Sequence, residues 1–156
     1  MNNNDILRRL RYALNLTDAE LVAVFALSDQ EVTEEAAVAM MLSEEEVGAT
    51  QCTDVLMTDF LDGLILERRG PRKEGSPAPV AEPELTNNAV LKKLRIAMSF
   101  HEDDMLGVLA AGGHKMSRGE LSALFRKPGH KHYRGCGDQV LRNFLTGLTM
   151  RTRSSS

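Results

Sequence analysis

The sequence predicts an all-α protein made of two tandem four-helix repeats, which are related by an offset of 84 residues and joined by a proline-rich linker. Three observations support this fold class. The 156 residues include no tryptophan and only two tyrosines, whereas the helix-favouring residues Leu, Ala, Met, Glu and Arg are abundant. Apolar residues recur at the spacing of one helix face. The first half of the chain also aligns with the second half without a gap.

The internal repeat covers residues 3–69 and 87–153, in which 16 of 67 aligned pairs are identical. Average composition alone gives about 4 or 5 identities by chance. Four of the five prolines lie between the two copies, where they favour extended backbone. The predicted organisation is therefore repeat one at 1–70, a linker at 71–86, repeat two at 87–153 and a frayed tail at 154–156.

Four helices are expected in each repeat, and in repeat one they span about 4–15, 18–27, 34–43 and 53–68. The first has an apolar stripe with Arg8 and Arg9 opposite it. Thr17 and Glu20 form a capping-box pattern at the start of the second. Thr33 begins the third, as Ser117 does in repeat two, and Gly70-Pro71 ends the fourth.

Gly63 and Gly147 occupy the same position on the apolar side of the two longest helices. A glycine inside a helix costs about 1 kcal/mol relative to alanine, so its appearance in both copies needs a reason. We predict that another helix crosses closely at each glycine, and that Gly63→Leu destabilises the fold by overpacking.

Several segments, taken together, resemble the YehS family of bacterial proteins, whose members contain a duplicated domain of unknown function. The similarity covers nearly the whole chain except the linker. It implies the duplication and a bacterial cytoplasmic setting, and it brings no catalytic residues. The segments that carry it are Asn87-Asn88-x-Val90-Leu91-Lys92-Lys93-Leu94-Arg95, Cys136-Gly137-Asp138-Gln139, Phe144-Leu145-x-Gly147-Leu148 and their counterparts in repeat one.

Charge divides the chain more sharply than its net value of −3 suggests. Residues 1–70 carry a balance of −9, residues 71–86 of −1 and residues 87–156 of +7, and all four histidines lie in the last segment. The contrast is strongest in one equivalent loop. Its sequence is Glu44-Glu45-Glu46-Val47-Gly48-Ala49-Thr50-Gln51 in repeat one and Pro128-Gly129-His130-Lys131-His132-Tyr133-Arg134-Gly135 in repeat two.

Three interpretations of this asymmetry remain open from the sequence. Both loops can be solvated faces that serve solubility. The acidic repeat can instead meet the basic repeat, within one chain or between chains. Alternatively, the basic repeat binds an external polyanion such as RNA, DNA or an acidic protein. The candidate anion-binding residues are Lys92, Lys93, Lys127, Lys131, Arg134 and Arg142.

Other recurring polar residues are assigned structural roles. We predict an Arg11–Asp54 ion pair and its counterpart, Arg95–Asp138, each joining the first helix of a repeat to the last. Asn3-Asn4 and Asn87-Asn88 are interpreted as N-cap residues.

The two cysteines, Cys52 and Cys136, are expected to be small buried apolar residues rather than nucleophiles. A zinc site at His130, His132 and Cys136, with His114 as a fourth ligand, is considered but not predicted, because no C-x-x-C accompanies it.

No catalytic motif, cofactor motif or membrane segment is found, and two cysteines make no disulfide framework. We therefore expect a cytoplasmic protein without cofactor, metal or small-molecule substrate. The predicted function is a non-enzymatic helical binding module, whose partner is another protein or a second copy of the chain. The alternative is a nucleic-acid-binding protein that uses the basic second repeat.

Overall fold

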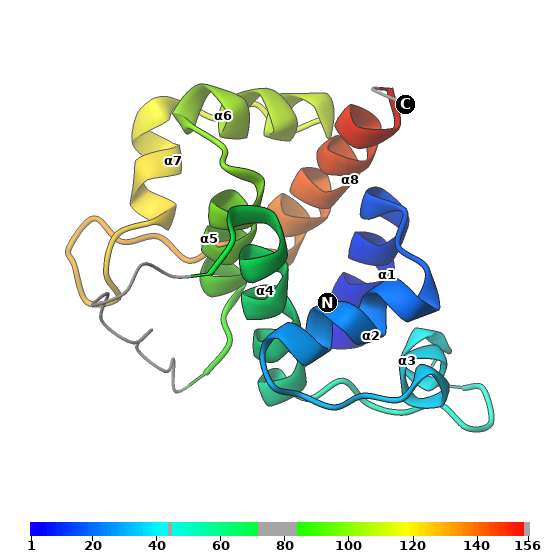
Figure 1. The fold of residues 1–156 in the computed structure, drawn as a ribbon. Helices are drawn as coiled ribbons and strands as arrows, with labels where there is room; N and C mark the ends of the chain where they lie inside the picture. The colour runs from blue at the N-terminus through cyan, green and yellow to red at the C-terminus, as the bar shows by residue number, and fades with distance from the viewer. Residues whose placement is uncertain (44, 72–83, 155–156) are drawn as a thin grey trace. The chain divides into compact units, whose positions relative to one another are not determined.

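The computed structural model describes residues 1–43, 45–71 and 84–154. Every regular element in those ranges is an α-helix, which confirms the predicted fold class (Figure 1). The helices are α1 (Asn3–Leu14), α2 (Asp18–Leu27), α3 (Glu34–Met41), α4 (Asp54–Arg69), α5 (Asn87–Met98), α6 (Glu102–Ala111), α7 (Arg118–Leu124) and α8 (Asp138–Ser154).

The chain divides into two compact units that correspond to the two repeats, except that Tyr12–Leu14 of α1 group with the second unit. Each helix of repeat two starts 84 residues after its counterpart in repeat one, so the predicted offset holds for all four pairs. Pro77, Pro79 and Pro83 of the predicted linker, and residues 155–156 of the predicted tail, lie outside the described residues. The last helix continues through Ser154, one residue into that tail.

Helix starts follow the capping chemistry of the sequence. Thr17 forms a complete capping box with Glu20, and Ser117 does the same with Glu120. Thr33 accepts the backbone N–H of Ala36 and begins α3. These contacts satisfy amide groups that the first turn of a helix leaves without partners.

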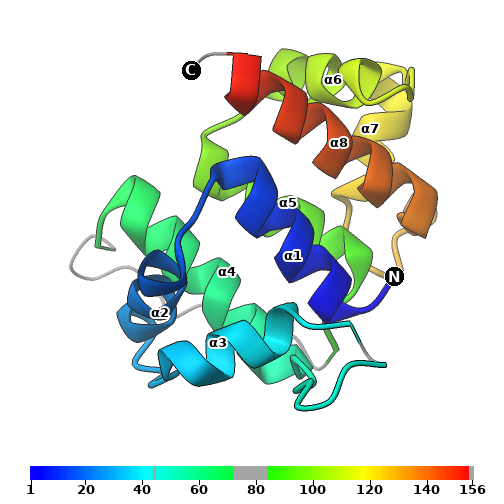
Figure 2. The ribbon, with the colours of Figure 1, turned by 90° about the vertical axis from the view of Figure 1, so that its right-hand side faces the viewer.

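The close crossing predicted at the two glycines is present in both repeats. In repeat one α2 packs on α4, and in repeat two α6 packs on α8, as two views at right angles show (Figures 1 and 2). A Cβ atom on Gly63 would lie 2.0 Å from the carbonyl oxygen of Val24, and one on Gly147 would lie 1.8 Å from that of Val108. Glycine is thus required by proximity, because a backbone carbonyl occupies the space of any side chain.

Each core is completed by an aromatic pair around the phenylalanine before that glycine. Phe60 pairs with Phe25 of α2 at a centroid distance of 5.3 Å. Phe144 pairs with Phe100, which precedes α6, at 6.4 Å in an edge-to-face arrangement. These contacts fall in the range in which aromatic pairs stabilise a core beyond their buried area.

Among the described helices, none is both long enough and apolar enough to cross a bilayer.

Candidate functional site

The first helix of each repeat is fastened to the rest of the unit by a pair of asparagines. Asn4 Nδ2 donates to the carbonyls of Met40 (3.0 Å) and Thr50 (2.8 Å), and its Oδ1 accepts the backbone N–H of Cys52 (2.9 Å). Asn3 Nδ2 donates to the carbonyl of Cys52 (3.2 Å) and to Asp54 Oδ1 (2.7 Å). We call this arrangement the asparagine clasp.

Repeat two builds the same asparagine clasp atom for atom. Asn88 donates to the carbonyls of Leu124 (3.0 Å) and Arg134 (2.9 Å) and accepts from Cys136 N (2.8 Å). Asn87 donates to the carbonyl of Cys136 (3.0 Å) and to Asp138 Oδ1 (2.8 Å). The clasp ties both ends of the loop between the third and fourth helices to the first helix.

The interpretation of these asparagines as N-caps was therefore wrong. Thr86 caps α5, and Asn2 Oδ1 accepts the backbone N–H of Asp5 at the start of α1. The asparagines lie one and two residues further on, where their amides point across the unit. The presence of the same two asparagines in both repeats was the available signal. An N-cap position tolerates several residue types, whereas a position that needs a side-chain amide to donate and accept at the same time does not.

The predicted ion pairs Arg11–Asp54 and Arg95–Asp138 are also wrong. Each aspartate accepts from the first clasp asparagine, Asn3 or Asn87, at the start of the first helix. Each arginine lies eight residues further along that helix, about 12 Å away along its axis. The arginine Nε instead donates to the carbonyl of Leu16 (3.1 Å) or Phe100 (3.2 Å), which holds the turn after the helix.

The remaining contacts of these two arginines differ between the repeats. Arg11 pairs with Asp18 at 2.8 Å, whereas the guanidinium of Arg95 lies over the ring of Phe125, 4.8 Å from its centroid. Phe125 stands where repeat one has Met41 and provides the ring for a cation–π contact, whereas Glu102, the counterpart of Asp18, pairs with Arg118.

Both cysteines are buried, as predicted, with Cys52 exposing 1% of its surface and Cys136 8%. Burial, with the nearby carboxylate of Asp54, raises the pKa of the Cys52 thiol to about 12. Burial and Asp138 raise the pKa of Cys136 to about 11. Both thiols are therefore protonated near neutral pH, the opposite of what a nucleophilic cysteine requires.

The histidines considered for zinc lie on the exposed part of the loop. The rings of His130 and His132 are 5.7 Å apart, and the backbone N–H of His132 donates to His130 Nδ1. Within the described ranges no three His, Cys, Asp or Glu side chains come together as a metal site.

The two charged loops share one backbone hydrogen-bond pattern despite their unrelated sequences. In repeat one, Glu46 N–H donates to Ser43, Ala49 N–H to Glu46 and Thr50 N–H to Ala39. In repeat two the same three bonds join His130 to Lys127, Tyr133 to His130 and Arg134 to Ala123, each shifted by 84 positions. We call residues 43–50 the acidic loop, of which Glu44 is not described, and residues 127–134 the basic loop.

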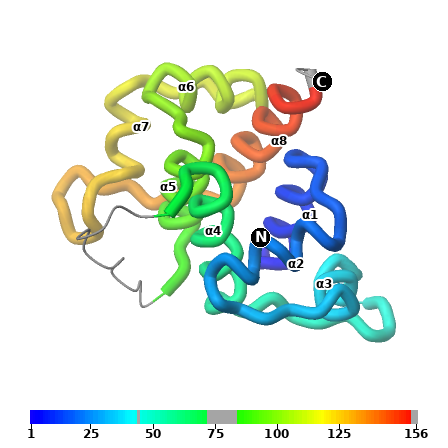
Figure 3. The backbone as a smooth tube through the Cα atoms, viewed as in Figure 1, coloured from blue at the N-terminus to red at the C-terminus, as the bar shows by residue number. Residues whose placement is uncertain are grey.

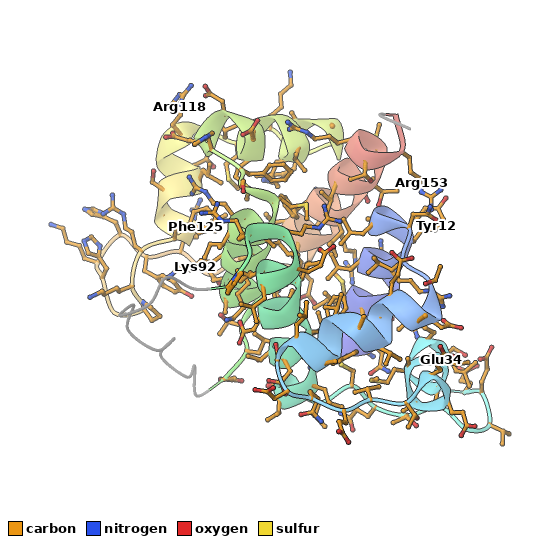
Figure 4. The ribbon with its side chains drawn as sticks, in the orientation of Figure 1. Tyr12, Glu34, Lys92, Arg118, Phe125 and Arg153 are labelled. Atoms are coloured by element: carbon orange, nitrogen blue, oxygen red, sulfur yellow. The ribbon has the colours of Figure 1, made fainter. Side chains whose placement is uncertain are left out.

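A hollow of about 530 Å³ lies between α7 and the basic loop, and we call it the α7 hollow. Figure 3 shows the loop as a wide bend after α7, and Figure 4 shows its side chains pointing outward. The hollow is open to solvent and more polar than apolar. The residues that line it are Gly119, Glu120, Ala123, Arg126, Lys131, His132, Tyr133 and Arg134.

The structure brings only part of the predicted anion-binding set into this hollow. Lys131 and Arg134 line it and are exposed. Lys127 and Lys92 are exposed but do not line it, and Lys93 and Arg142 are half-buried on α5 and α8.

Arg126 lines the hollow and was missed by sequence reasoning. The signal was available, because Arg126 stands where repeat one has Leu42. Arg118, at the start of α7, does not line the hollow (Figure 4). Its side chain pairs with Glu102 and Asp103 of α6.

The single carboxylate of the hollow is held in its charged form. Glu120 accepts the backbone N–H of Ser117 and so completes the capping box of α7, and this hydrogen bond lowers the pKa of Glu120. Arg134 lies 3.8 Å away. Three cations (Arg126, Lys131 and Arg134) against one carboxylate leave the lining with a formal charge of +2 when His132 is neutral.

Comparison with known proteins agrees with this duplicated architecture. A protein of Escherichia coli (strain K12) described as "Uncharacterized protein YehS" is 44% identical over 151 residues, which cover 97% of this chain and 96% of that protein. No solved structure matches the chain. The family described as "Protein of unknown function (DUF1456)" matches twice, at residues 3–70 and 87–154. The chain therefore belongs to the DUF1456 family and contains its domain in two copies.

Proposed function

We propose that this protein is a non-enzymatic binding module whose second repeat holds an acidic segment of a protein partner in the α7 hollow. The main observation behind the proposal is that the two repeats share the backbone of this loop but differ in the side chains along it. The hydrogen bonds of the two loops correspond one to one, yet Arg126, Lys131 and Arg134 stand where repeat one has Leu42, Val47 and Thr50.

The physical logic is that of a scaffold with a replaceable surface. The asparagine clasp holds the loop ends, so exposed positions between them change without loss of the fold. Complementary charge on such a surface mainly raises the rate and the specificity of association with the partner, and raises the affinity less. The two cysteines offer no nucleophile, since both thiols are buried and protonated.

A direct test is binding of a fluorescein-labelled hexaglutamate peptide to the full chain, followed by fluorescence anisotropy. We expect binding at low salt that weakens steeply as salt rises, because charges at an exposed hollow are screened. Arg126→Gln with Lys131→Gln should weaken binding by at least about tenfold, the effect of 1.4 kcal/mol. Lys92→Gln with Lys115→Gln removes the same charge from other exposed positions and is the matched control.

Nucleic acid is the second candidate partner, favoured by the +7 balance of repeat two. Phosphate contacts would give affinity that falls linearly with the logarithm of salt concentration. Tyr133 is the single aromatic residue of the basic loop, so the loop offers little for base stacking. A 20-nucleotide RNA and a DNA duplex, tested in the same anisotropy assay as the peptide, decide between the two candidate partners. A nucleic-acid site would bind the RNA or DNA far more tightly than the hexaglutamate peptide.

A further inference from the structure

We infer that the acidic segment held in the α7 hollow is the acidic loop of a second copy of this chain, so that chains associate head to tail. This inference rests on the proposed function and names its partner. It draws on the tip of the acidic loop, the charge balance of the hollow and the non-equivalence of the two repeats.

The acidic loop has the form of a projecting ligand. Glu45 and Glu46 are exposed, and Val47 beside them is 100% exposed. An exposed apolar side chain next to acidic residues is stabilised when a partner covers it. Three backbone hydrogen bonds brace the loop, and Gly48, with φ of +90°, makes the turn after the tip. A braced loop loses less conformational entropy on binding than a free peptide does.

The α7 hollow matches this tip in charge and in size of side chain. Its formal charge of +2 is opposite in sign to the −3 that Glu44, Glu45 and Glu46 give the acidic loop. Gly119, which has no side chain, and Ala123, which has only a methyl group, lie one helical turn apart on α7 and leave room for a side chain such as Val47. The ring of half-buried Tyr133 adds an apolar wall.

Each repeat is suited to one of the two roles. The positions of repeat two that match Glu45, Glu46 and Val47 hold Gly129, His130 and Lys131. Repeat one, in turn, lacks the cations of the hollow, as described above. A chain thus has one donor loop and one acceptor hollow, which makes a heterologous contact that builds open chains or closed rings.

The inference is tested by sedimentation of the full-length protein over a range of concentrations. At about 20 mM salt the average mass should rise above the 17.2 kDa of the monomer with concentration, and it should return to monomer at about 0.5 M salt. Glu45→Gln with Glu46→Gln removes the donor, and Arg126→Gln with Lys131→Gln removes the acceptor. Each double variant alone should remain monomeric.

An equimolar mixture of the two double variants gives the sharpest result. The first still has a working hollow and the second a working loop, so the mixture should form a dimer and nothing larger. The matched control is Glu31→Gln with Glu67→Gln, which changes repeat one by the same charge at exposed positions and should associate like the wild type. Circular dichroism of every variant shows that the fold is retained.

Failure of this inference is distinguishable from failure of the proposed function. A wild-type protein that stays monomeric at low salt, yet binds the hexaglutamate peptide through Arg126 and Lys131, overturns the self-partner while the proposed function stands. Association that persists in both double variants also overturns it. A protein that neither associates nor binds the peptide overturns both.

Discussion

The two repeats keep one polar framework and differ in the surface that it supports. Asn4 and Asn88 make equivalent sets of three hydrogen bonds. Gly63 and Gly147 each lie against the backbone carbonyl of an equivalent valine in the second helix of their repeat. The exposed loop positions between these anchors carry opposite charge. Residues that satisfy buried backbone groups thus have little freedom to change, whereas solvated ones can acquire a new partner.

Helix packing also differs in detail at the end of the second helix of each repeat. In repeat one, Ser28 donates its hydroxyl to the carbonyl of Asp59 at 2.8 Å. Repeat two has Gly112 there, and a Cβ atom on it would lie 1.7 Å from the carbonyl oxygen of Asn143. The second repeat therefore has no room at this position for the side chain that the first repeat uses.

The largest expected effect follows from the helix crossings that both repeats share. Gly63→Ala and Gly147→Ala should each destabilise the protein by about 3 kcal/mol, because a rigid backbone carbonyl must move. Urea denaturation measures the loss. Gly107→Ala on α6 is the matched control, since nothing lies within 4 Å of its Cβ position, and it should stabilise by up to about 1 kcal/mol. Equal behaviour of all three variants would refute the crossing.

The next effect sharpens the difference between the repeats. Gly112→Ser should destabilise by about 2 kcal/mol, because the added side chain meets the Asn143 carbonyl. The reverse change, Ser28→Gly, removes one hydrogen bond and should cost about 1 kcal/mol. Thermal unfolding of both variants measures whether Gly112→Ser lowers stability more than Ser28→Gly does. If Gly112→Ser left the stability unchanged, the two helix crossings would be equivalent at this position.

The asparagine clasp predicts losses of intermediate size in both repeats. Asn4→Ala should cost about 1–3 kcal/mol, because it leaves the buried N–H of Cys52 without an acceptor. Asn88→Ala should cost less, since Asn4 is 7% exposed and Asn88 is half-buried, which lets water replace part of the contact. Denaturant titration of each variant measures both values. A larger loss for Asn88→Ala would contradict the role of burial.

The smallest effect concerns the thiols at alkaline pH. Burial in the folded protein raises the pKa of Cys52 to about 12 and that of Cys136 to about 11, from the ordinary thiol value of 9.0. Above pH 9 the unfolded chain releases these protons first, so stability falls as pH rises and is unaffected by them below pH 9. Iodoacetamide at pH 8 should alkylate both cysteines slowly in the folded protein and rapidly in urea. Rapid alkylation of folded protein would contradict the burial.

Much of the fold was available from residue order because its determinants are local. Helical periodicity, the Thr17–Glu20 capping box and the stop at Gly70 depend on residues within one or two turns of each other. The glycines were also informative, since a costly residue found twice at one register indicates a packing constraint. The partners of Arg11 and Asn3 were not predicted, because such contacts depend on where distant helices meet.

The sequence by itself determined the duplication and the segregation of charge, which appear when residue n is compared with residue n+84. It also determined the eight helices of the described residues, through their periodicity and capping residues. Only the tertiary structure decided that two asparagines fasten each loop and that Arg126 joins Lys131 and Arg134 around one hollow. The reason is physical. Propensity and capping act along the chain, whereas a clasp or a hollow exists only once separate segments lie within hydrogen-bonding or van der Waals distance.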